Sequence, residues 1–64
     1  MSKAKLIEKA IDKLKNYLLL LDYMLELYIS KNNVEMEENT EVEIRQINIL
    51  IGQLERERKQ LIGR

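Results

Sequence analysis

The sequence contains no cysteine and no histidine, and these two absences remove much of the chemistry open to a small protein. Without cysteine the chain can form neither a disulfide nor a thiolate metal site. Without histidine it lacks the commonest metal ligand and the usual general base near neutral pH. The base that usually activates a serine or threonine hydroxyl is therefore absent, as is the thiol nucleophile. We expect no enzyme: no catalytic residue, no cofactor and no metal site.

Proline is also absent, glycine occurs only twice, and the 64 residues allow one domain at most, residues 1–64. A chain of this length buries only about 60% of the surface that its unfolded form exposes. Small proteins usually compensate with disulfides, a metal or a second subunit. Because the first two are not expected here, association with a second copy is the expected source of additional stability.

Charge of one sign is not in excess, because eleven basic residues balance eleven acidic ones. Long apolar runs are missing as well. The most apolar segment, residues 17–29, contains Asp22 and Glu26, whereas a membrane-spanning helix needs about 20 apolar residues. The charged N-terminal segment lacks the apolar core of a secretory signal. We expect a cytoplasmic protein without membrane contact, and its richness in Ile, Lys and Asn is typical of a viral or plasmid protein of low-GC origin.

The apolar residues that are present recur at helical spacing, and leucine, isoleucine, glutamate and lysine favour helix throughout. Alternating steps of three and four residues place them on one side of a first helix, expected at about residues 3–30. Ser2 is the expected N-cap of this helix, since its hydroxyl can accept a hydrogen bond from the first turn. The stripe consists of Ile7, Ala10, Ile11, Leu14, Tyr17, Leu18, Leu21, Met24, Leu25 and Tyr28.

A second helix is expected at about residues 41–62. Thr40 followed by Glu43 has the spacing of a capping box, which would begin this helix, and Gly63 would end it. Asn32 and Asn33 favour the left-handed backbone that ends a helix. The intervening residues up to 40 are therefore expected to form an acidic turn. The apolar stripe of the second helix consists of Ile44, Ile47, Leu50, Ile51, Leu54 and Leu61.

Two helices and a turn predict an all-α fold, an antiparallel hairpin whose two apolar faces differ in width. Leu6, Leu20 and Leu27 widen the face of the first helix, whereas the second helix has glutamines at positions 46, 53 and 60. The second helix cannot cover the first, so we predict a homodimer that forms a four-helix bundle with coiled-coil packing. The predicted dimer interface consists of Leu14, Tyr17, Leu18, Leu20, Leu21, Met24, Leu25, Leu27, Tyr28, Ile47, Leu50 and Leu54.

The charges are unevenly distributed along the expected hairpin. The net charge is +3 in residues 1–15, −5 in residues 16–54 and +2 in residues 55–64. Both termini would lie at one end of the hairpin, which is basic, and the turn at the other end, which is acidic. Opposite charges select between otherwise similar packings. We therefore predict that the two hairpins of the dimer run in opposite directions.

The sequence predicts a non-catalytic adaptor or regulatory protein that acts through protein–protein interaction. The candidate partner surface comprises Leu19, Asp22, Tyr23, Glu26, Glu35, Glu37 and Glu38. The alternative is an RNA- or DNA-binding regulator that uses the basic end. That expected architecture resembles the plasmid Rop proteins, dimers of helical hairpins of similar length, although no motif is shared with them. The candidate nucleic-acid surface comprises Lys3, Lys5, Lys9, Lys13, Arg56, Arg58, Lys59 and Arg64.

Overall fold

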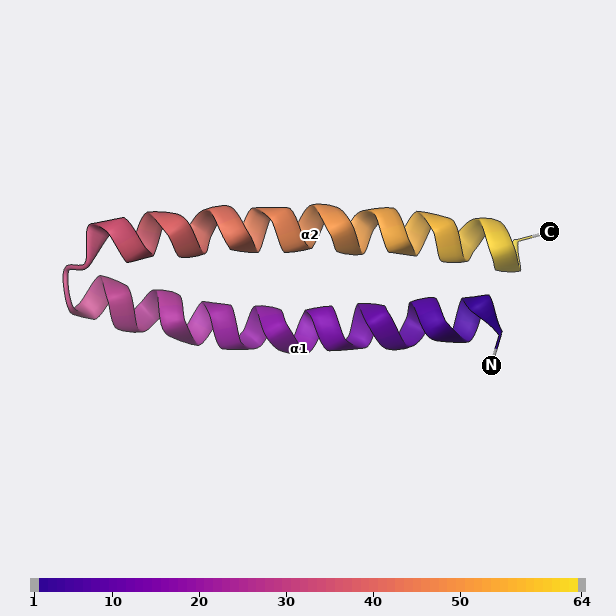
Figure 1. Cartoon of the computed structure of the whole chain (residues 1–64), viewed down its shortest axis with the longest axis horizontal. Coiled ribbons are helices and arrows are strands. Elements are labelled where there is room, and N and C mark those ends of the chain that lie inside the picture. Colours follow the sequence, from indigo (N-terminus) through magenta and orange to yellow (C-terminus); the bar gives the residue numbers. More distant parts are fainter. Residues whose placement is uncertain (1, 64) are drawn as a thin grey trace.

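A computed structural model describes residues 2–63 and shows two antiparallel helices joined by a tight turn (Figure 1). Helix α1 spans Lys3–Ser30 and helix α2 spans Val34–Ile62. The two helices lie side by side along their whole length, and both termini lie at the same end (Figure 1). The predicted all-α hairpin is confirmed. The hairpin is a rod of 49 × 17 × 12 Å.

The ends of α1 are those that the sequence predicts. The Ser2 hydroxyl accepts a hydrogen bond from the Lys5 N–H, which satisfies one of the unpaired amides of the first turn. At the other end Asn32 has a left-handed backbone with φ of 56°, and the Asn33 N–H donates to the Tyr28 carbonyl. Asparagine tolerates this conformation better than most residues. The chain reverses direction within residues 31–33 as a result.

Helix α2 begins seven residues earlier than the sequence predicts, at Val34 instead of residue 41. Its N-cap is Asn33, whose side-chain oxygen accepts from the Met36 N–H. The predicted capping box at Thr40 is wrong: Thr40 lies inside the helix, and its hydroxyl donates to the Met36 carbonyl at 2.7 Å. The segment from 34 to 39 contains neither proline nor glycine, and acidic side chains favour the first turn of a helix. The glutamates assigned to a turn are therefore helical.

The capping role of Asn33 predicts a stability change. Asn33→Ala should lower the free energy of unfolding by about 1 kcal/mol, because the Met36 amide loses its acceptor. Asn48→Ala is the matched control, since Asn48 is exposed inside α2 and alanine is the better helix former there. Urea denaturation followed by circular dichroism measures both. An Asn33→Ala variant as stable as the parent would contradict this assignment of the helix start.

The C-terminal end of α2 also follows the prediction. Gly63 is the C-cap residue, and its N–H donates to the Lys59 carbonyl at 2.8 Å. Its φ of −78° is not left-handed. A Cβ at this position would approach the Lys59 carbonyl oxygen to 2.8 Å, so a larger residue would strain the cap.

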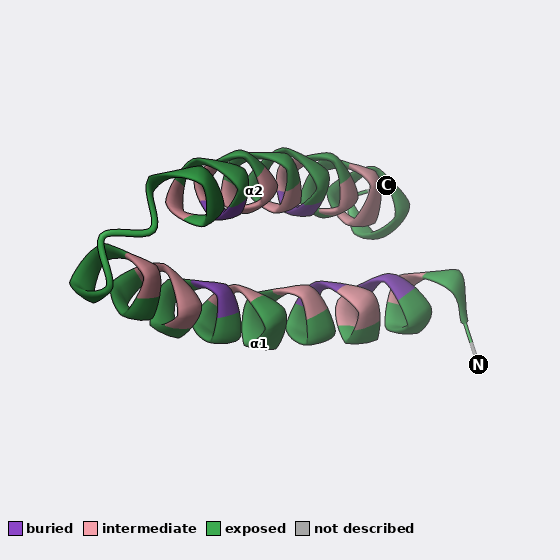
Figure 2. Ribbon diagram, turned by 60° about the vertical axis from the view of Figure 1, so that its left-hand side comes forward, coloured by how far each residue is buried: buried purple, intermediate pink, exposed green. Residues whose placement is uncertain are grey.

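The core is a single seam between the helices, and buried positions face inward on both (Figure 2). Ile7, Ile11 and Ile51 form its buried centre, with Leu14, Leu18, Ile47 and Leu54 packed against them. Leu21 is the most buried side chain, at 3% exposure. None of the described side chains is completely enclosed. Two helices thus leave most of each helix surface outside the core.

The exposed surface of the hairpin is large for its mass. Its accessible area is 5119 Å², whereas a compact monomer of 7.6 kDa exposes about 4,300 Å². The excess, about 800 Å², equals what one partner contributes to an interface of standard size. The hairpin therefore has enough surplus surface for an interface with a partner.

Candidate interaction surfaces

Two contacts between the helices define one side of the hairpin. The Tyr17 hydroxyl of α1 donates to Glu43 Oε1 of α2 at 2.8 Å, and Lys3 Nζ lies 3.2 Å from Glu57 Oε1. Tyr17 and Lys3 are fourteen residues apart, as are Glu57 and Glu43. Residues separated by multiples of seven lie on the same side of a helix, because two turns take about 7.2 residues. Both contacts therefore mark the same side.

The same side carries a row of exposed apolar residues, which we call the open face. On α1 the row at seven-residue spacing from Leu6 contains Lys13, Leu20 and Leu27, beside Tyr17. On α2 the row through Glu43 and Glu57 also contains Met36 and Leu50. The exposed apolar members of the open face are Leu6, Tyr17, Leu20, Leu27, Met36 and Leu50. Leu6 and Leu20 are more than half exposed, at 55% and 51%.

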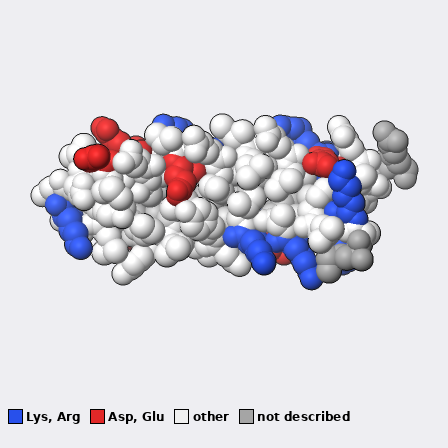
Figure 3. Space-filling model, in the orientation of Figure 1, with Lys and Arg blue, Asp and Glu red and all other residues white. Residues whose placement is uncertain are grey.

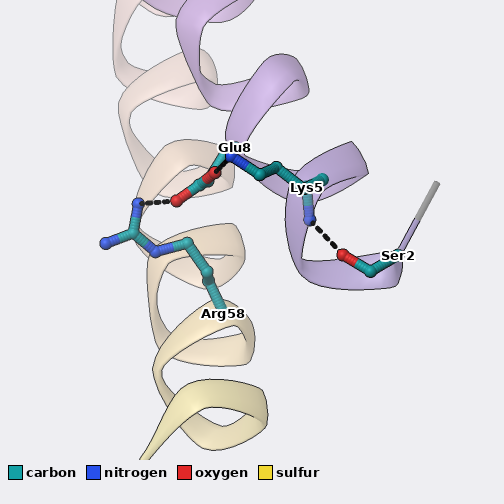
Figure 4. Close-up of polar contacts among 4 residues, drawn as sticks. All are labelled: Ser2, Lys5, Glu8 and Arg58. Atoms are coloured by element: carbon teal, nitrogen blue, oxygen red, sulfur yellow. Dashed lines mark hydrogen bonds and ion pairs between the residues drawn. The ribbon is translucent and has the colours of Figure 1, made fainter.

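The opposite side of the hairpin is charged instead. There α1 presents Glu8, Lys15 and Asp22, and α2 presents Glu41 and Glu55, all at seven-residue spacing. The Arg58 guanidinium reaches across to Glu8 on this side, with 3.4 Å between Nη1 and Oε1 (Figure 4). The two sides of the hairpin therefore differ in composition: the open face mixes leucines with a few charged residues, Lys13, Glu43 and Glu57 among them, whereas the opposite side is mainly charged.

The predicted dimer-interface residues divide between the internal seam and the open face. Leu14, Leu18, Ile47 and Leu54 pack within the hairpin, and Leu21 is buried near the middle of α1. Met24, Leu25 and Tyr28 are half-buried between the helices. Tyr17, Leu20, Leu27 and Leu50 are exposed on the open face.

Two residues of the open face, Leu6 and Met36, were missing from the predicted dimer interface, although Leu6 was expected to widen the apolar face of the first helix. Leu6 lies fourteen residues before Leu20, and Met36 lies fourteen before Leu50. The seven-residue spacing was present in the sequence. Met36 was missed because residues 31–40 were assigned to a turn, where helical spacing has no meaning.

The surroundings of the Tyr17 hydroxyl change its pKa. Its hydrogen bond to Glu43, together with the negative charge of that carboxylate, raises the pKa of the Tyr17 hydroxyl above 10. The bond requires the protonated phenol as donor. Its contribution to stability is therefore complete below pH 10 and is lost as the pH rises through the higher pKa of the folded protein.

The basic residues gather at the end of the hairpin that holds the termini, and glutamates gather over α2 toward the turn (Figure 3). Part of the basic charge is compensated there: Lys3 pairs with Glu57, while Lys5 and Arg58 both approach Glu8. These pairs are exposed, so each is worth about 0–1 kcal/mol. Within residues 2–63, Lys9, Lys13, Arg56 and Lys59 have no carboxylate within 4.0 Å, and Arg64 lies outside the described residues.

The candidate partner residues divide into two groups. Glu35, Glu37 and Glu38 lie in the first turns of α2, where the helix dipole favours negative charge whether or not a partner binds. Leu19 and Tyr23 lie one turn apart on the outer side of α1 and are 68% and 60% exposed. Asp22 and Glu26 flank them on the same helix, also exposed.

Across residues 2–63 no group of three or more acidic side chains lies in a position to hold a metal ion. No helix in that range is long and apolar enough to cross a membrane. No protein-family model matches the chain, and comparisons with curated proteins and with solved structures found no match. The surfaces of the hairpin itself are therefore the basis for a functional proposal.

Proposed function

We propose that this chain is a non-catalytic adaptor that acts as a homodimer, in which two hairpins pack through their open faces into a four-helix bundle. One observation supports this above all: three exposed leucines of α1, Leu6, Leu20 and Leu27, lie on the same side of the hairpin as the exposed Met36 and Leu50 of α2. A surface helix that packs against a single neighbouring element needs only one apolar stripe. Helix α1 has two adjacent stripes, as expected for a helix that contacts both its own α2 and a neighbouring hairpin.

The size of the open face suits this role. Fully burying a leucine contributes roughly 1.5–3 kcal/mol, and each subunit would bury three exposed leucines from α1 and one from α2. Association costs an estimated 4–15 kcal/mol in lost freedom of motion. Because these leucines are already about half-buried in the hairpin, two copies of the open face gain about half of the full amount, which is of the same size as this cost. The charged side offers no comparable gain.

The charges at the two ends favour hairpins that run in opposite directions. Residues 16–44 contain seven acids and the single cation Lys31, whereas five lysines lie in residues 1–15. In the opposite orientation each basic end lies beside the acidic end of the partner. In the same orientation like charges would meet at both ends, which electrostatic complementarity disfavours.

The adaptor role follows from what the bundle leaves uncovered. Packing through the open faces uses one side of each hairpin and leaves its outer and charged sides in contact with water. Surfaces that carry both apolar and charged groups are typical of protein interfaces. A two-fold symmetric bundle would present each such surface twice, so that it could join two copies of a partner.

Absolute mass by light scattering during size-exclusion chromatography tests the proposal. We expect about twice the chain mass of 7.6 kDa at low and at high salt, because apolar contacts are not screened by ions. A monomer at every concentration tested would overturn the homodimer. A dimer that dissociates at high salt would show that the charged ends, and not the open faces, hold the subunits together.

A further inference from the structure

We propose that the outer side of α1 is a docking site for a basic amphipathic segment of a partner protein. We call this site the outer ridge: Leu19 and Tyr23, with the carboxylates of Asp12, Asp22 and Glu26 around them. The proposal rests on the proposed function in that it names the partner class of the adaptor. It does not require the dimer, because the outer ridge is complete within one chain.

Exposure and position single out Leu19. It is the most exposed large apolar side chain among residues 2–63, at 68%. Successive residues turn by about 100° around a helix, which places Leu19 on the far side from the core residue Leu21 and well away from Leu20 of the open face. Neither the hairpin core nor the proposed dimer covers it. Tyr23, one turn further on, lies between Leu19 and the open face.

The carboxylates around Leu19 form no ion pair with any residue between 2 and 63. Asp12, Asp22 and Glu26 lie seven before, three after and seven after Leu19, so all share its side of the helix. None of the three is within 4.0 Å of a lysine or arginine nitrogen in the described part of the chain. Asp12 has Lys9 three residues before it and Lys15 three residues after it, whereas Asp22 and Glu26 have no basic residue three or four positions away in α1. The outer ridge thus pairs an apolar contact point with unneutralised negative charge.

Glutamates of α2 extend the same negative region across the charged side of the hairpin. The Tyr17–Glu43 contact sets the register, so residues further toward the turn in α1 lie level with residues just before Glu43 in α2. Asp22 therefore lies near the level of Glu38 and Glu41. A bound segment would meet carboxylates from both helices.

The sign of this charge selects the occupant. Nucleic acid and anionic lipid surfaces carry negative charge and are repelled by the outer ridge. A second copy could reach the ridge only with its basic end, part of which is already paired with Glu8 and Glu57. A helical protein segment with lysine or arginine beside leucines complements both features of the outer ridge: its cations can pair with the carboxylates, and its leucines can pack against Leu19 and Tyr23. Such a helix presents apolar anchors one turn apart, which matches the spacing of Leu19 and Tyr23.

Fluorescence anisotropy with a short labelled peptide of leucine and lysine in helical spacing tests the site on the full chain. We expect the peptide to bind, and binding to weaken at high salt. Leu19→Ala should weaken binding about tenfold, because it removes a central anchor. Asp22→Lys with Glu26→Lys should weaken binding at least as much. Ile49→Ala is the matched control, because Ile49 is 62% exposed on the outer side of α2, away from the ridge. It should leave binding unchanged.

Three results would overturn the proposal: no binding of the peptide, equal binding to the Leu19→Ala variant, or a loss confined to Leu20→Ala. The last result would place the peptide on the open face. Light scattering on the same samples gives their molar mass. This measurement tests the homodimer separately from the docking site. A monomer that binds the peptide through Leu19 rejects the homodimer and keeps the docking site, whereas a dimer indifferent to Leu19→Ala does the reverse.

Discussion

Replacing Leu20 by lysine should convert the dimer into monomers, whereas the same replacement at the neighbouring Leu19 should leave it intact. Both leucines are exposed in the hairpin, at 51% and 68%. They differ in direction: Leu20 lies on the open face and Leu19 on the outer side of α1. A general sensitivity of this helix to lysine would affect both variants equally.

The expected effect at Leu20 is large because each dimer contains the change twice. Leu20 is already about half-buried in the hairpin, so a lysine at position 20 removes about half of the 1.5–3 kcal/mol of a complete leucine burial per subunit. When the hairpins run in opposite directions, Leu20 lies near Lys13 of the partner subunit, so the new cation would also face a like charge. An uncompensated charge in an interface costs several kcal/mol more. We expect the dissociation constant to rise by at least about a hundredfold, which corresponds to roughly 2.7 kcal/mol.

Light scattering over a range of concentrations measures the dissociation, and far-UV circular dichroism of the same samples shows whether the helices persist. Monomeric Leu20→Lys with Leu19→Lys still dimeric supports the open-face dimer. If both variants dissociate, or neither does, the interface lies elsewhere on the hairpin. If Leu20→Lys loses its helices on dilution while Leu19→Lys keeps them, the hairpin depends on its partner for folding, which also supports the dimer.

Single cysteines should report the relative direction of the hairpins, and the natural chain supplies no competing thiol. Leu6 and Leu27 belong to the same row of α1 and are 21 residues apart, or about 31 Å along a helix. They lie at nearly equal distances from the middle of Lys3–Ser30. In hairpins that run oppositely, residue 6 of one subunit therefore meets residue 27 of the other.

Leu6→Cys and Leu27→Cys should each form few disulfides alone and should cross-link rapidly when both are present, as separate chains or as one double variant. A disulfide requires the two Cα atoms to come within about 7 Å, and copies of the same residue would stay about 31 Å apart. Non-reducing electrophoresis during mild oxidation measures the rates. Leu19→Cys supplies the background rate of chance collisions. Rapid disulfide formation by Leu6→Cys alone would show that the hairpins run in the same direction.

The element boundaries show where local sequence sufficed and where it did not. Ser2, Asn32 and Gly63 act as the residue types predict, because a cap or a left-handed turn depends on a few neighbouring atoms. Thr40 misled the prediction, because a threonine followed three residues later by glutamate also occurs inside helices. Asn33 offered an equally good cap seven residues earlier. Once a cap has begun a helix, nothing in a run without proline or glycine stops it.

The candidate site was partly predictable for the same reason. The outward position of Leu19 and Tyr23 followed from counting around one helix, as did the excess width of the apolar face of α1. The shared side of Leu20 and Leu50 did not follow from counting. It depends on how α2 is rotated against α1, and that rotation is visible in the contacts Tyr17–Glu43 and Lys3–Glu57.

By itself the sequence determined the two helices, their antiparallel order and the opposite charges of the two ends. These follow from interactions within a helical turn and from the break between the two helical patterns after residue 30. Only the tertiary structure decided how α2 is rotated against α1, and therefore which exposed residues of α1 and α2 form one face. The physical reason is that packing two stripes together fixes the rotation of each helix about its axis. That rotation, invisible to either helix alone, decides which apolar rows remain open to a partner.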